Sequence, residues 1–578
     1  MSSNKLMYKN IKSSLLYFLQ KTRKGTITVF SILATLFIAQ NGNAQDFNII
    51  LGRPTNSAIT ISILFKQSTE FYIQYGTNAS ALNQNTDTFS TTSVFPSEIE
   101  LINLLTNQLY FYKVYYKTLS ASNFLVSSTF HFRTQRTSGE TFRFTVEADE
   151  HLYDKKGVRS LYDICLKNQA AANPDFMLTL GDIFGDDHYP YTITEQEIDN
   201  LHEQYRPILG NITHSIPFYV CLGNHEGEMD YYLNQNPGNN MAYYATKYRQ
   251  LYYPNPSPNS FYSGNTQQES WGIGYPENYY AWKWGDALFV VLDVYRDQCD
   301  TSAKPGGWSW TLGEPQYQWL KSTLENNTSK FKFVFAHHIS GQGRGGINQA
   351  KLFEWGGNDS KGQNNFNNKR PGWGKPIHQL FVDNGVNIFF QGHDHVFAHE
   401  TLDGVIYQAL PMPCDSTYMI GKLANADAYT QDTLAGSGHL TVTVSATCVK
   451  VAYMSAFLPK DTNILNQKNN QVVFEYAIGD CSTLGEQNPQ IKPTLRIYPN
   501  PAANLINFEL QNVLSTNSIQ TASNSKNPIF EIYDLTGKRI ATTSETAFDS
   551  QFLPAGIYVV KAHINQQTLQ SKFIKTPN

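Results

Sequence analysis

Clusters of basic residues are scarce in this 578-residue sequence, and so are charges of either sign. Charged residues make up only 16% of the chain, and the formal net charge is −4. Binding to nucleic acid depends on clustered Lys and Arg at the phosphates, so this shortage argues against a polyanion-binding surface. Aromatic residues, at 13%, are abundant, which is typical of an extracellular globular protein and not of a disordered one.

A long apolar run is also missing. The apolar segment from Ile27 to Ala39 has 13 residues, whereas a membrane-spanning helix needs about 20. Residues 1–44 contain six basic and no acidic residues and end in Gly42-Asn43-Ala44, so we expect a secretory signal peptide cleaved after Ala44 and no transmembrane segment in the mature chain. No cysteine follows that site, which disfavours a lipoprotein. Removal of 1–44 changes the net charge from −4 to −10, and nucleic-acid binding is therefore not expected.

Cysteine is rare, with six residues in the chain. In an exported protein these cysteines can pair, but six of them allow 15 connectivities and the sequence selects none. Cys221 lies in an apolar segment that is typical of a buried strand. We expect it to remain a free, buried thiol.

The length predicts three or four structural units, at roughly 150 residues per domain. Residues 46–136 have short alternating β segments with polar turns, which predict a β-sandwich. Residues 140–480 alternate strands with helices, including a helix over Val158–Asn168 and one that opens at a Thr194–Glu197 capping box. A polar linker is expected at 481–493, followed by a second β unit at 494–578.

Five short motifs with metal-ligand residues each follow an apolar, strand-like segment. They are Asp149-Glu-His151, Gly181-Asp182, Gly223-Asn224-His225-Glu226, His337 and Gly392-His393-Asp-His395. Loops at strand ends converge while the sheet holds them rigid, so we expect these side chains to meet. Taken one at a time, each motif is more often structural than catalytic. The complete set favours a metal site.

In order and content these motifs resemble the signature of the calcineurin-like metallophosphoesterase superfamily. The segment Tyr279–Asp293 and the β unit before the motifs are most similar to purple acid phosphatases, whose N-terminal module is of the fibronectin type III kind. The resemblance implies a central four-layer αββα sandwich and two metal ions, of Zn, Mn or Fe. It further implies that one ion is held by Asp149, His151 and His395, the other by Asn224, His337 and His393, and that Asp182 bridges them.

One position departs from that pattern. Purple acid phosphatases place a tyrosine ligand three residues after the bridging aspartate, and this sequence has Gly185 there. The same group usually lacks the histidine of the first motif, whereas His151 is present. We expect one ligand to replace the other, with loss of the colour that a ferric phenolate gives.

The resemblance implies hydrolysis of a phosphate ester by in-line attack of a metal-bridging hydroxide. His225 is expected to act as leaving-group acid or transition-state stabiliser, with a hydrogen-bonding role as the alternative, and Glu226 to orient it. Asn224, His225 and Arg344 are expected substrate contacts. His338 is the alternative to His337 as a ligand.

The chain has two long insertions, Met229–Trp284 and Gly341–Lys375. Loops of this length are usually functional or disordered. The aromatic residues of the first either stack a leaving group or pack the loop, and we favour packing.

Three segments near the C-terminus, Leu495–Pro501, Phe530–Lys538 and Leu553–Val560, resemble in order the C-terminal sorting domain of type IX secretion in Bacteroidetes. The alternative is a second immunoglobulin-like spacer. The resemblance implies that Sec and type IX machinery carry the protein through the periplasm of a Gram-negative bacterium to the surface or medium.

The leading hypothesis is a secreted, acid phosphatase-like phosphomonoesterase. A phosphodiesterase or nucleotide phosphohydrolase on the same metals is the alternative among enzymes. From another class, a surface binding or adhesion protein with an inactive fold is possible, although no ligand position is lost.

Overall fold

The computed structural model describes residues 46–92, 94–233, 240–269, 273–297, 307–339, 344–420, 425–465, 467–482, 494–511, 528–564 and 567–577. The predicted signal peptide, Cys299, residues 341–343 and most of the predicted linker lie outside these residues. Among the helices of the described residues, none has both the length and the apolar character needed to cross a bilayer.

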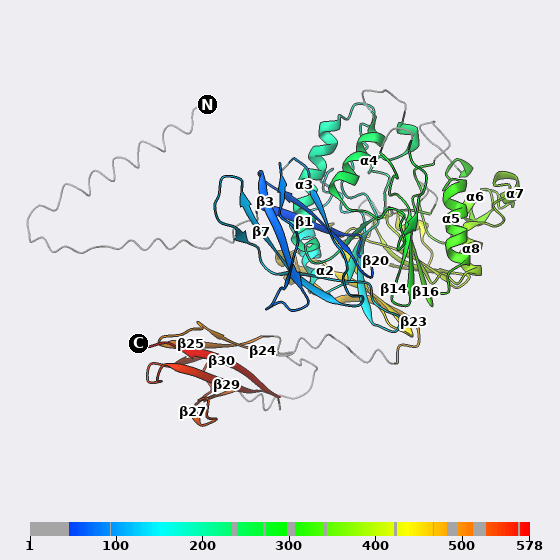
Figure 1. Cartoon of the computed structure of the whole chain (residues 1–578). Helices are drawn as coiled ribbons and strands as arrows, with labels where there is room; N and C mark the ends of the chain where they lie inside the picture. Colours follow the sequence, from blue (N-terminus) through cyan, green and yellow to red (C-terminus); the bar gives the residue numbers. More distant parts are fainter. Residues whose placement is uncertain are drawn as a thin grey trace, which may run out of the picture. The chain divides into compact units, whose positions relative to one another are not determined.

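The first structural region is a β-sandwich, drawn in blue and cyan in Figure 1. One sheet has the order β1(Phe47–Gly52), β2(Ile59–Phe65), β6(Ser97–Leu101), and the other β4(Gln84–Asn85), β3(Thr69–Gly76), β7(Leu109–Thr118), β8(Leu125–Val126), with β5(Phe89–Thr91) on β3 and β9(Phe130–Arg133) on β7. Alternate residues of β3 and β7 are buried, as period-2 strands require. The predicted sandwich is confirmed, and its fibronectin-like identity stays a prediction.

Two larger sheets form the central region. The first has the order β12(Phe218–Val220), β11(Phe176–Thr179), β10(Phe142–Glu147), β21(Gly438–Val444), β22(Cys448–Ser455), β23(Val472–Gly479). The second has the order β13(Ser263–Gly264), β14(Tyr280–Trp284), β15(Ala287–Val291), β16(Phe331–Phe335), β17(Ile388–Gln391), β19(Val405–Ala409), β18(Phe397–Leu402), β20(Asp432–Leu434). Strands β10, β11 and β12 are parallel, and so are β15, β16, β17 and β19.

Neighbouring residues of these strands enter different cores, which defines the layers. Phe289 and Val291 of β15 pack in the core between the two sheets. Leu288 and Val290, on the opposite face, pack in the core that also contains Leu320 of a covering helix. Because the central strands of each sheet are buried on both faces, β11, β15 and β17 read as nearly continuous apolar runs. The predicted αββα arrangement is confirmed.

The helices cover the outer faces of the sheets (Figure 1). They are α2(Arg159–Ala171), α3(Glu195–Thr213), α4(Met241–Tyr252), α5(Glu314–Glu325), α6(Phe353–Gly356), α7(Phe366–Lys369), α8(Ile377–Asp383) and α9(Pro459–Leu465), with short 3₁₀ turns at Asp230–Tyr232, Gly307–Ser309, Gln349–Lys351 and Ala426–Ala428. Helix α3 begins at the predicted Thr194–Glu197 capping box. Helix α4 buries Tyr248 and Tyr252, so packing is one use of the aromatic residues of the first insertion.

The C-terminal region contains two small antiparallel sheets. Their orders are β24(Thr494–Tyr498), β25(Leu505–Gln511), β28(Ala547–Asp549) and β27(Arg539–Thr543), β26(Ile529–Tyr533), β29(Gly556–Ile564), β30(Gln567–Lys575). Ile506 and Phe508 of the first sheet share a core with Phe530, Val560 and Phe573 of the second. The predicted second β-sandwich is confirmed.

One cysteine pairing is present in the described residues. Cys448, at the start of β22, forms a disulfide with Cys481, just beyond the end of β23. Cys165, Cys221 and Cys414 are buried free thiols, so the prediction for Cys221 is confirmed. The bond closes the end of the central fold immediately before the polar segment that leads to the C-terminal sandwich.

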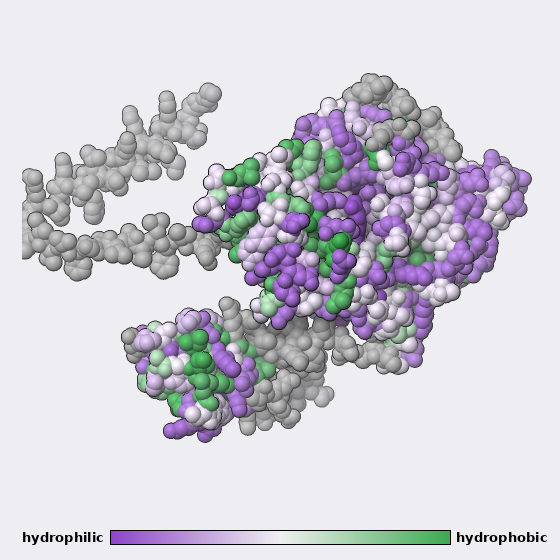
Figure 2. Space-filling view, viewed as in Figure 1, coloured by the Kyte–Doolittle hydropathy of each residue, from purple (hydrophilic) through white to green (hydrophobic). Residues whose placement is uncertain are grey.

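The surface in Figure 2 is mostly hydrophilic, with scattered hydrophobic residues. Exposed apolar side chains of the first sandwich include Leu105, Leu119 and Leu125. Single exposed apolar residues of this kind are normal for a folded protein and do not by themselves mark a binding surface.

Candidate metal centre

All five motifs follow strands of the two central sheets. Asp149 comes after β10, Asp182 after β11 and Asn224 after β12, while His337 follows β16 and His393 follows β17. The ends of the two sheets are joined at this edge, because the His393 backbone N–H donates to Asp149 Oδ2 at 2.8 Å. Motifs that are far apart in the sequence therefore meet at one place, as expected for the carboxyl ends of parallel strands.

The backbone at this site is unusual. Five of the seven expected ligands, Asp149, His151, Asp182, His393 and His395, have φ between 47° and 65°. Residues other than glycine seldom adopt this left-handed region, and each such residue costs of order 1 kcal/mol or more. A concentration of strained residues at one spot is typical of a functional site, where the surrounding structure fixes side chains that the chain alone would not present.

Asp149, His151 and His395 form the first group of ligand-type atoms. His395 Nε2 lies 3.4 Å from Asp149 Oδ1, and His151 Nε2 lies 3.0 Å from His395 Nε2. The Nδ1 atom of His151 lies 3.2 Å from Asp154 Oδ2. Because a carboxylate only accepts hydrogen bonds, this contact places the proton on Nδ1 and leaves the Nε2 lone pair free.

Asp182, His337 and His393 form the second group. His337 Nε2 lies 3.2 Å from both Asp182 Oδ2 and His393 Nδ1. His337 Nδ1 donates to the Leu180 carbonyl at 2.7 Å, so its Nε2 atom faces the group. His338, the alternative ligand, is buried beside His393, with ring centroids 4.8 Å apart, but it is His337 that joins the group with Asp182.

Asp182 lies between the two groups. Its Oδ2 atom is 3.2 Å from His337 Nε2 and 3.8 Å from His151 Nε2. Asn224, 8% exposed, has a buried Oδ1 atom with no hydrogen-bond partner among the described residues. A buried acceptor without a partner is costly, and a cation would satisfy it. Imidazole, carboxylate and amide oxygen donors fit Zn, Mn or Fe ions.

The charges of the buried side chains agree with a cation site. Burial alone would raise the pKa of Asp182, but His337 and His225 outweigh it and hold that pKa well below its usual range. The pKa of Asp149 is lowered in the same way, against burial, by His395 and His337. Burial and then the neighbouring His338 and His337 hold the pKa of His393 well below its ordinary value. The centre therefore combines ionised carboxylates with a neutral imidazole at His393. Burial would lower the pKa of His337, but Asp182 and Asp149 outweigh it and raise that pKa to about 9, so His337 releases a proton when a metal binds.

His225 lies beside the metal-ligand groups and has its own carboxylate partner. Its Nδ1 atom is 2.6 Å from Asp187 Oδ1, and its Nε2 atom is 3.8 Å from Asp182 Oδ2. Burial would lower the pKa of His225, but Asp182 and Asp187 outweigh it and raise that pKa to about 9. Asp182 and Asp187 thereby favour a protonated imidazole, which faces the centre through Nε2.

Glu226 does not orient His225, which corrects the sequence-based expectation. Its carboxylate instead accepts the backbone N–H groups of Asp182 at 2.9 Å, Ile183 at 2.8 Å and Gly223 at 2.6 Å. These N–H groups belong to two neighbouring strand-end loops and are buried, so they need an acceptor. Glu226 thereby fixes the loop of Asp182 against the loop of Asn224.

The backbone at Gly185 explains why no tyrosine is found there. A Cβ atom added to Gly185 would overlap the His225 carbonyl oxygen and the Glu226 Cα atom. A tyrosine does contact the centre from a different position, because Tyr153 Oη lies 2.8 Å from His151 Nδ1. Burial and the nearby Asp182 raise the pKa of Tyr153 well above its usual value, so the phenol stays neutral.

Arg344 lies beside the second group. Its Nη1 atom donates to the His393 carbonyl at 2.8 Å, and the side chain is 39% exposed. The guanidinium therefore combines a fixed anchor at the centre with N–H groups open to solvent. Its expected contact with substrate stays a prediction.

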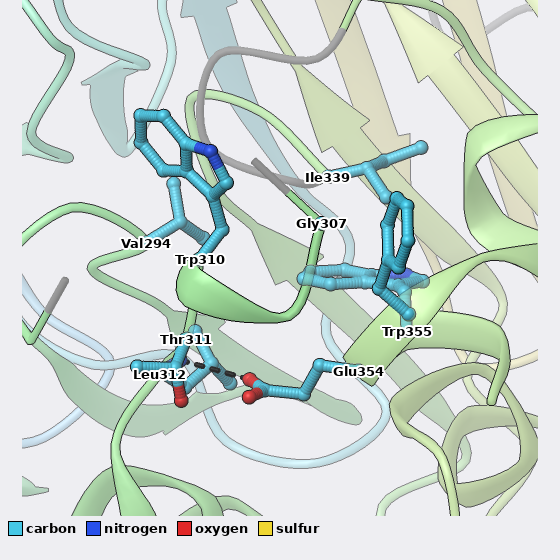
Figure 3. Close-up of a pocket in the computed structure, with 9 residues that line it drawn as sticks. Val294, Gly307, Trp310, Thr311, Leu312, Ile339, Glu354 and Trp355 are labelled. Carbon is cyan, nitrogen blue, oxygen red and sulfur yellow. Dashed lines mark hydrogen bonds between the residues drawn. The ribbon is translucent and has the colours of Figure 1, made fainter. Parts of the chain in front are cut away.

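A small cavity is lined by Ile339, which is two residues beyond His337 in the sequence, and by Trp310, Glu354 and Trp355 (Figure 3). Glu354 accepts the Leu312 N–H at 2.8 Å and pairs with Arg370 at 2.5 Å, so this buried acid is satisfied. The free volume of about 20 Å³ holds a water molecule but not a phosphate ester. This cavity is therefore too small to be the substrate site.

Three residues at the centre were not foreseen from the sequence: Tyr153, Asp154 and Asp187. The first two follow His151 closely, and Asp187 follows Asp182 in the run Asp186-Asp187-His188. An acid and a hydroxyl so close to ligand motifs are the signal that could have pointed to them.

Comparison with known families gives two matches. Residues 142–397 match the family described as calcineurin-like phosphoesterase, and residues 496–576 match the secretion system C-terminal sorting domain. No curated protein matches the sequence.

Solved structures resemble the fold at low sequence identity. A structure titled "Structure of PhoD" is 15% identical, with a TM-score of 0.52, and the match covers 75% of this chain and 90% of that one. Purple acid phosphatase PPD1 from yellow lupin seeds is 14% identical, with a TM-score of 0.49 and coverage of 75% and 74%. The first of these supports the fold alone.

Proposed function

We propose that this chain, whose residues 142–397 form the domain of a metal-dependent, calcineurin-like phosphoesterase, is a secreted phosphomonoesterase with two metal ions. The observation that carries the proposal is the position of Asp182. Its Oδ2 atom lies within 3.8 Å of a histidine nitrogen from each of two ligand groups, as a carboxylate shared by two cations would. The resemblance to purple acid phosphatases supports the monoesterase assignment.

In this proposal Asp149, His151 and His395 hold one ion, and Asn224, His337 and His393 hold the other. Asp182 is shared. When bound, two such ions supply an activated nucleophile at neutral pH and neutralise the phosphoryl oxygens. The chain contributes the rigid placement of the ligands, because Glu226 and the strand ends fix the loops that carry them.

His225 is the proposed general acid. Its Nε2 proton points toward the centre, and the carboxylate of Asp187 holds the ring through Nδ1. The leaving alkoxide of a monoester needs a proton, and an imidazolium at this place can supply it. Arg344 would add a charged contact to the phosphoryl group or its neighbour.

The deciding experiment is hydrolysis of a panel of phosphate mono- and diesters by the purified protein, with metal content measured on the same sample. We expect faster turnover of monoesters, with two metal ions per chain. Preference for diesters or nucleotides would replace the monoesterase proposal with the alternative enzyme on the same site. A metal-loaded protein without turnover would favour a binding or adhesion protein.

Asp187→Asn tests the acid through pH. Asp187 is one of the groups that raise the pKa of His225, so its loss should lower that pKa. A general acid must be protonated, and activity falls as pH rises through its pKa. The basic limb of the pH profile of kcat/KM should therefore move to lower pH in the variant.

The matched control for this variant is Asp186→Asn, because Asp186 pairs with His188 and not with His225. Its basic limb should stay in place. An unchanged limb in Asp187→Asn, or the same displacement in both variants, would contradict the acid role of His225.

The sorting domain at 496–576 indicates secretion or a cell-surface location in a bacterium of the Bacteroidetes type. We infer the route as well: Sec export by way of 1–44, then transfer from the periplasm by the type IX machinery. Deletion of 489–578 should leave active enzyme in the periplasm. The central region ends before this segment, where the Cys448–Cys481 disulfide links the start of β22 to the chain just beyond the end of β23.

Fractionation of cells with an activity assay in each fraction checks this prediction. The full chain is the control and should give activity at the surface or in the medium. If the truncated chain reached those fractions normally, the sorting role of 494–578 would be wrong.

A further inference from the structure

Two Asp–His pairs lie side by side at the outer rim of the centre. Asp187 contacts His225 Nδ1 at 2.6 Å, and Asp186 contacts His188 Nδ1 at 2.5 Å. The two imidazole rings are nearly parallel, at 19°, with centroids 5.4 Å apart. The metal-ligand assignment above uses neither Asp186 nor His188.

One carboxylate oxygen of Asp187, one nitrogen of His188 and one nitrogen of His225 lie within 4.8 Å of one another. Ligand atoms around a single tetrahedral Zn²⁺ lie about 3.3 Å apart. The exposed fractions of these side chains are 16%, 41% and 19%, so the cluster is open to solvent. Small shifts and ring rotations of these side chains can bring the three atoms to one ion.

We propose that Asp187, His188 and His225 form a third metal site, which takes a borderline divalent ion such as Zn²⁺ and inhibits the enzyme when it is filled. Imidazole and carboxylate ligands are the set that Zn²⁺ prefers. Two further side chains hold the ligands in place. Asp186 contacts His188 Nδ1, and the Tyr232 hydroxyl lies 3.5 Å from Asp187 Oδ2.

Inhibition follows because His225 is both a ligand of this third site and the proposed proton donor. Asp187 Oδ1 contacts His225 Nδ1 at 2.6 Å and thereby sets the ring orientation in which Nε2 lies 3.8 Å from Asp182 Oδ2. An ion shared by Asp187 and His225 replaces the hydrogen bond between them, so the ring turns away from the orientation that the proton donor needs. This step rests on the proposed function of His225, whereas the binding of the ion does not.

The test uses the full-length protein with its resident metals. Zn²⁺ is added in equilibrium dialysis, and every metal element bound per chain is counted by mass spectrometry. We expect the wild-type protein to bind one ion beyond the resident load. His188→Ala should bind that ion at least about 10-fold more weakly, by analogy with loss of a supporting group at a metal site.

The control variant is His563→Ala. His563 also pairs with a carboxylate, Glu531 at 2.9 Å, has the same 41% exposed side chain as His188, and lies outside residues 142–397. It should bind the additional ion as the wild type does. Without added Zn²⁺, His188→Ala should have wild-type activity, because His188 is not part of the proposed catalytic machinery.

Activity gives a second, separate readout. Wild-type turnover of a phosphate ester with a poor leaving group should fall over the same Zn²⁺ range in which the additional ion binds, and His188→Ala should need at least about 10-fold more Zn²⁺. Binding of the ion without this inhibition would overturn the inhibitory role and the acid role of His225 while leaving the metal site in place.

Three results would overturn the site itself. The first is a wild-type protein that binds no additional ion at concentrations that inhibit it. The second is Zn²⁺ uptake matched by loss of a resident metal. The third is an identical binding curve in His188→Ala and wild type. If the protein proved to hydrolyse no ester, the dialysis result would still decide whether the third site exists.

Discussion

Asp182→Asn should lower activity by about 10²–10³-fold, the usual cost of removing one group that stabilises charge in a transition state. Asparagine keeps the shape of the side chain and removes its charge. Asp182 is 1% exposed and faces His337 and His151, so solvent does not replace that charge. A carboxylate shared by two dications offsets charge on both, and its loss should weaken both ions.

Metal content measured together with turnover checks this prediction. The variant should hold fewer than two ions per chain after dialysis, and excess metal should restore part of the activity. Asp163→Asn is the matched control, because Asp163 is a half-exposed carboxylate on α2 that pairs with Arg159 at 3.0 Å. A variant at position 182 with full metal load and near-normal turnover would show that Asp182 is not a shared ligand.

Much of the architecture could be predicted from local sequence patterns. The apolar runs Phe142–Ala148 and Val386–Phe390 mark buried strands because both faces of each central sheet are covered. The start of α3 followed from a capping box whose two hydrogen bonds are local. The ligand motifs could be placed together because parallel strands end at one edge.

Contacts of single side chains across loops could not be predicted in the same way. Asp187 reaches His225 from 38 residues away, and nothing local separates it from its neighbour Asp186. Glu226 follows His225 directly, yet it points to the backbone of residues 182–183, because buried N–H groups require an acceptor. The Cys448–Cys481 pair was one of many possible pairings until the register of β22 and β23 fixed it.

The backbone strain at the centre is a further property that no local pattern revealed. His393 and His395 adopt positive φ, which is uncommon for any residue but glycine, and their sequence indicates only a turn after β17. The surrounding contacts hold them there, for instance the bond from the His393 N–H to Asp149 Oδ2. Strain of this kind is offset by long-range packing, so it appears only in the folded chain.

His225→Ala should behave differently from Asp182→Asn. The variant keeps every proposed metal ligand, so metal content should stay near normal. Turnover of esters with poor leaving groups should fall by about 10²–10⁴-fold, the usual contribution of general acid catalysis. The fall should be much smaller for p-nitrophenyl phosphate, because p-nitrophenolate leaves without protonation.

The comparison of the two substrate classes is what separates an acid from a structural residue. His399→Ala is the matched control: His399 has an 18% exposed side chain, against 19% for His225, and also pairs with a carboxylate, Asp432 at 3.4 Å. Damage to the fold would lower turnover of good and poor leaving groups equally, since both need the intact centre. Loss of a metal ion would do the same and would also show in the metal content. Only the loss of a proton donor produces a deficit in turnover that grows as the leaving group becomes more basic. An equal deficit for good and poor leaving groups, or a missing metal ion, would mean that His225 is a ligand or a structural residue. The division of the centre into seven ligands and one acid would then be wrong.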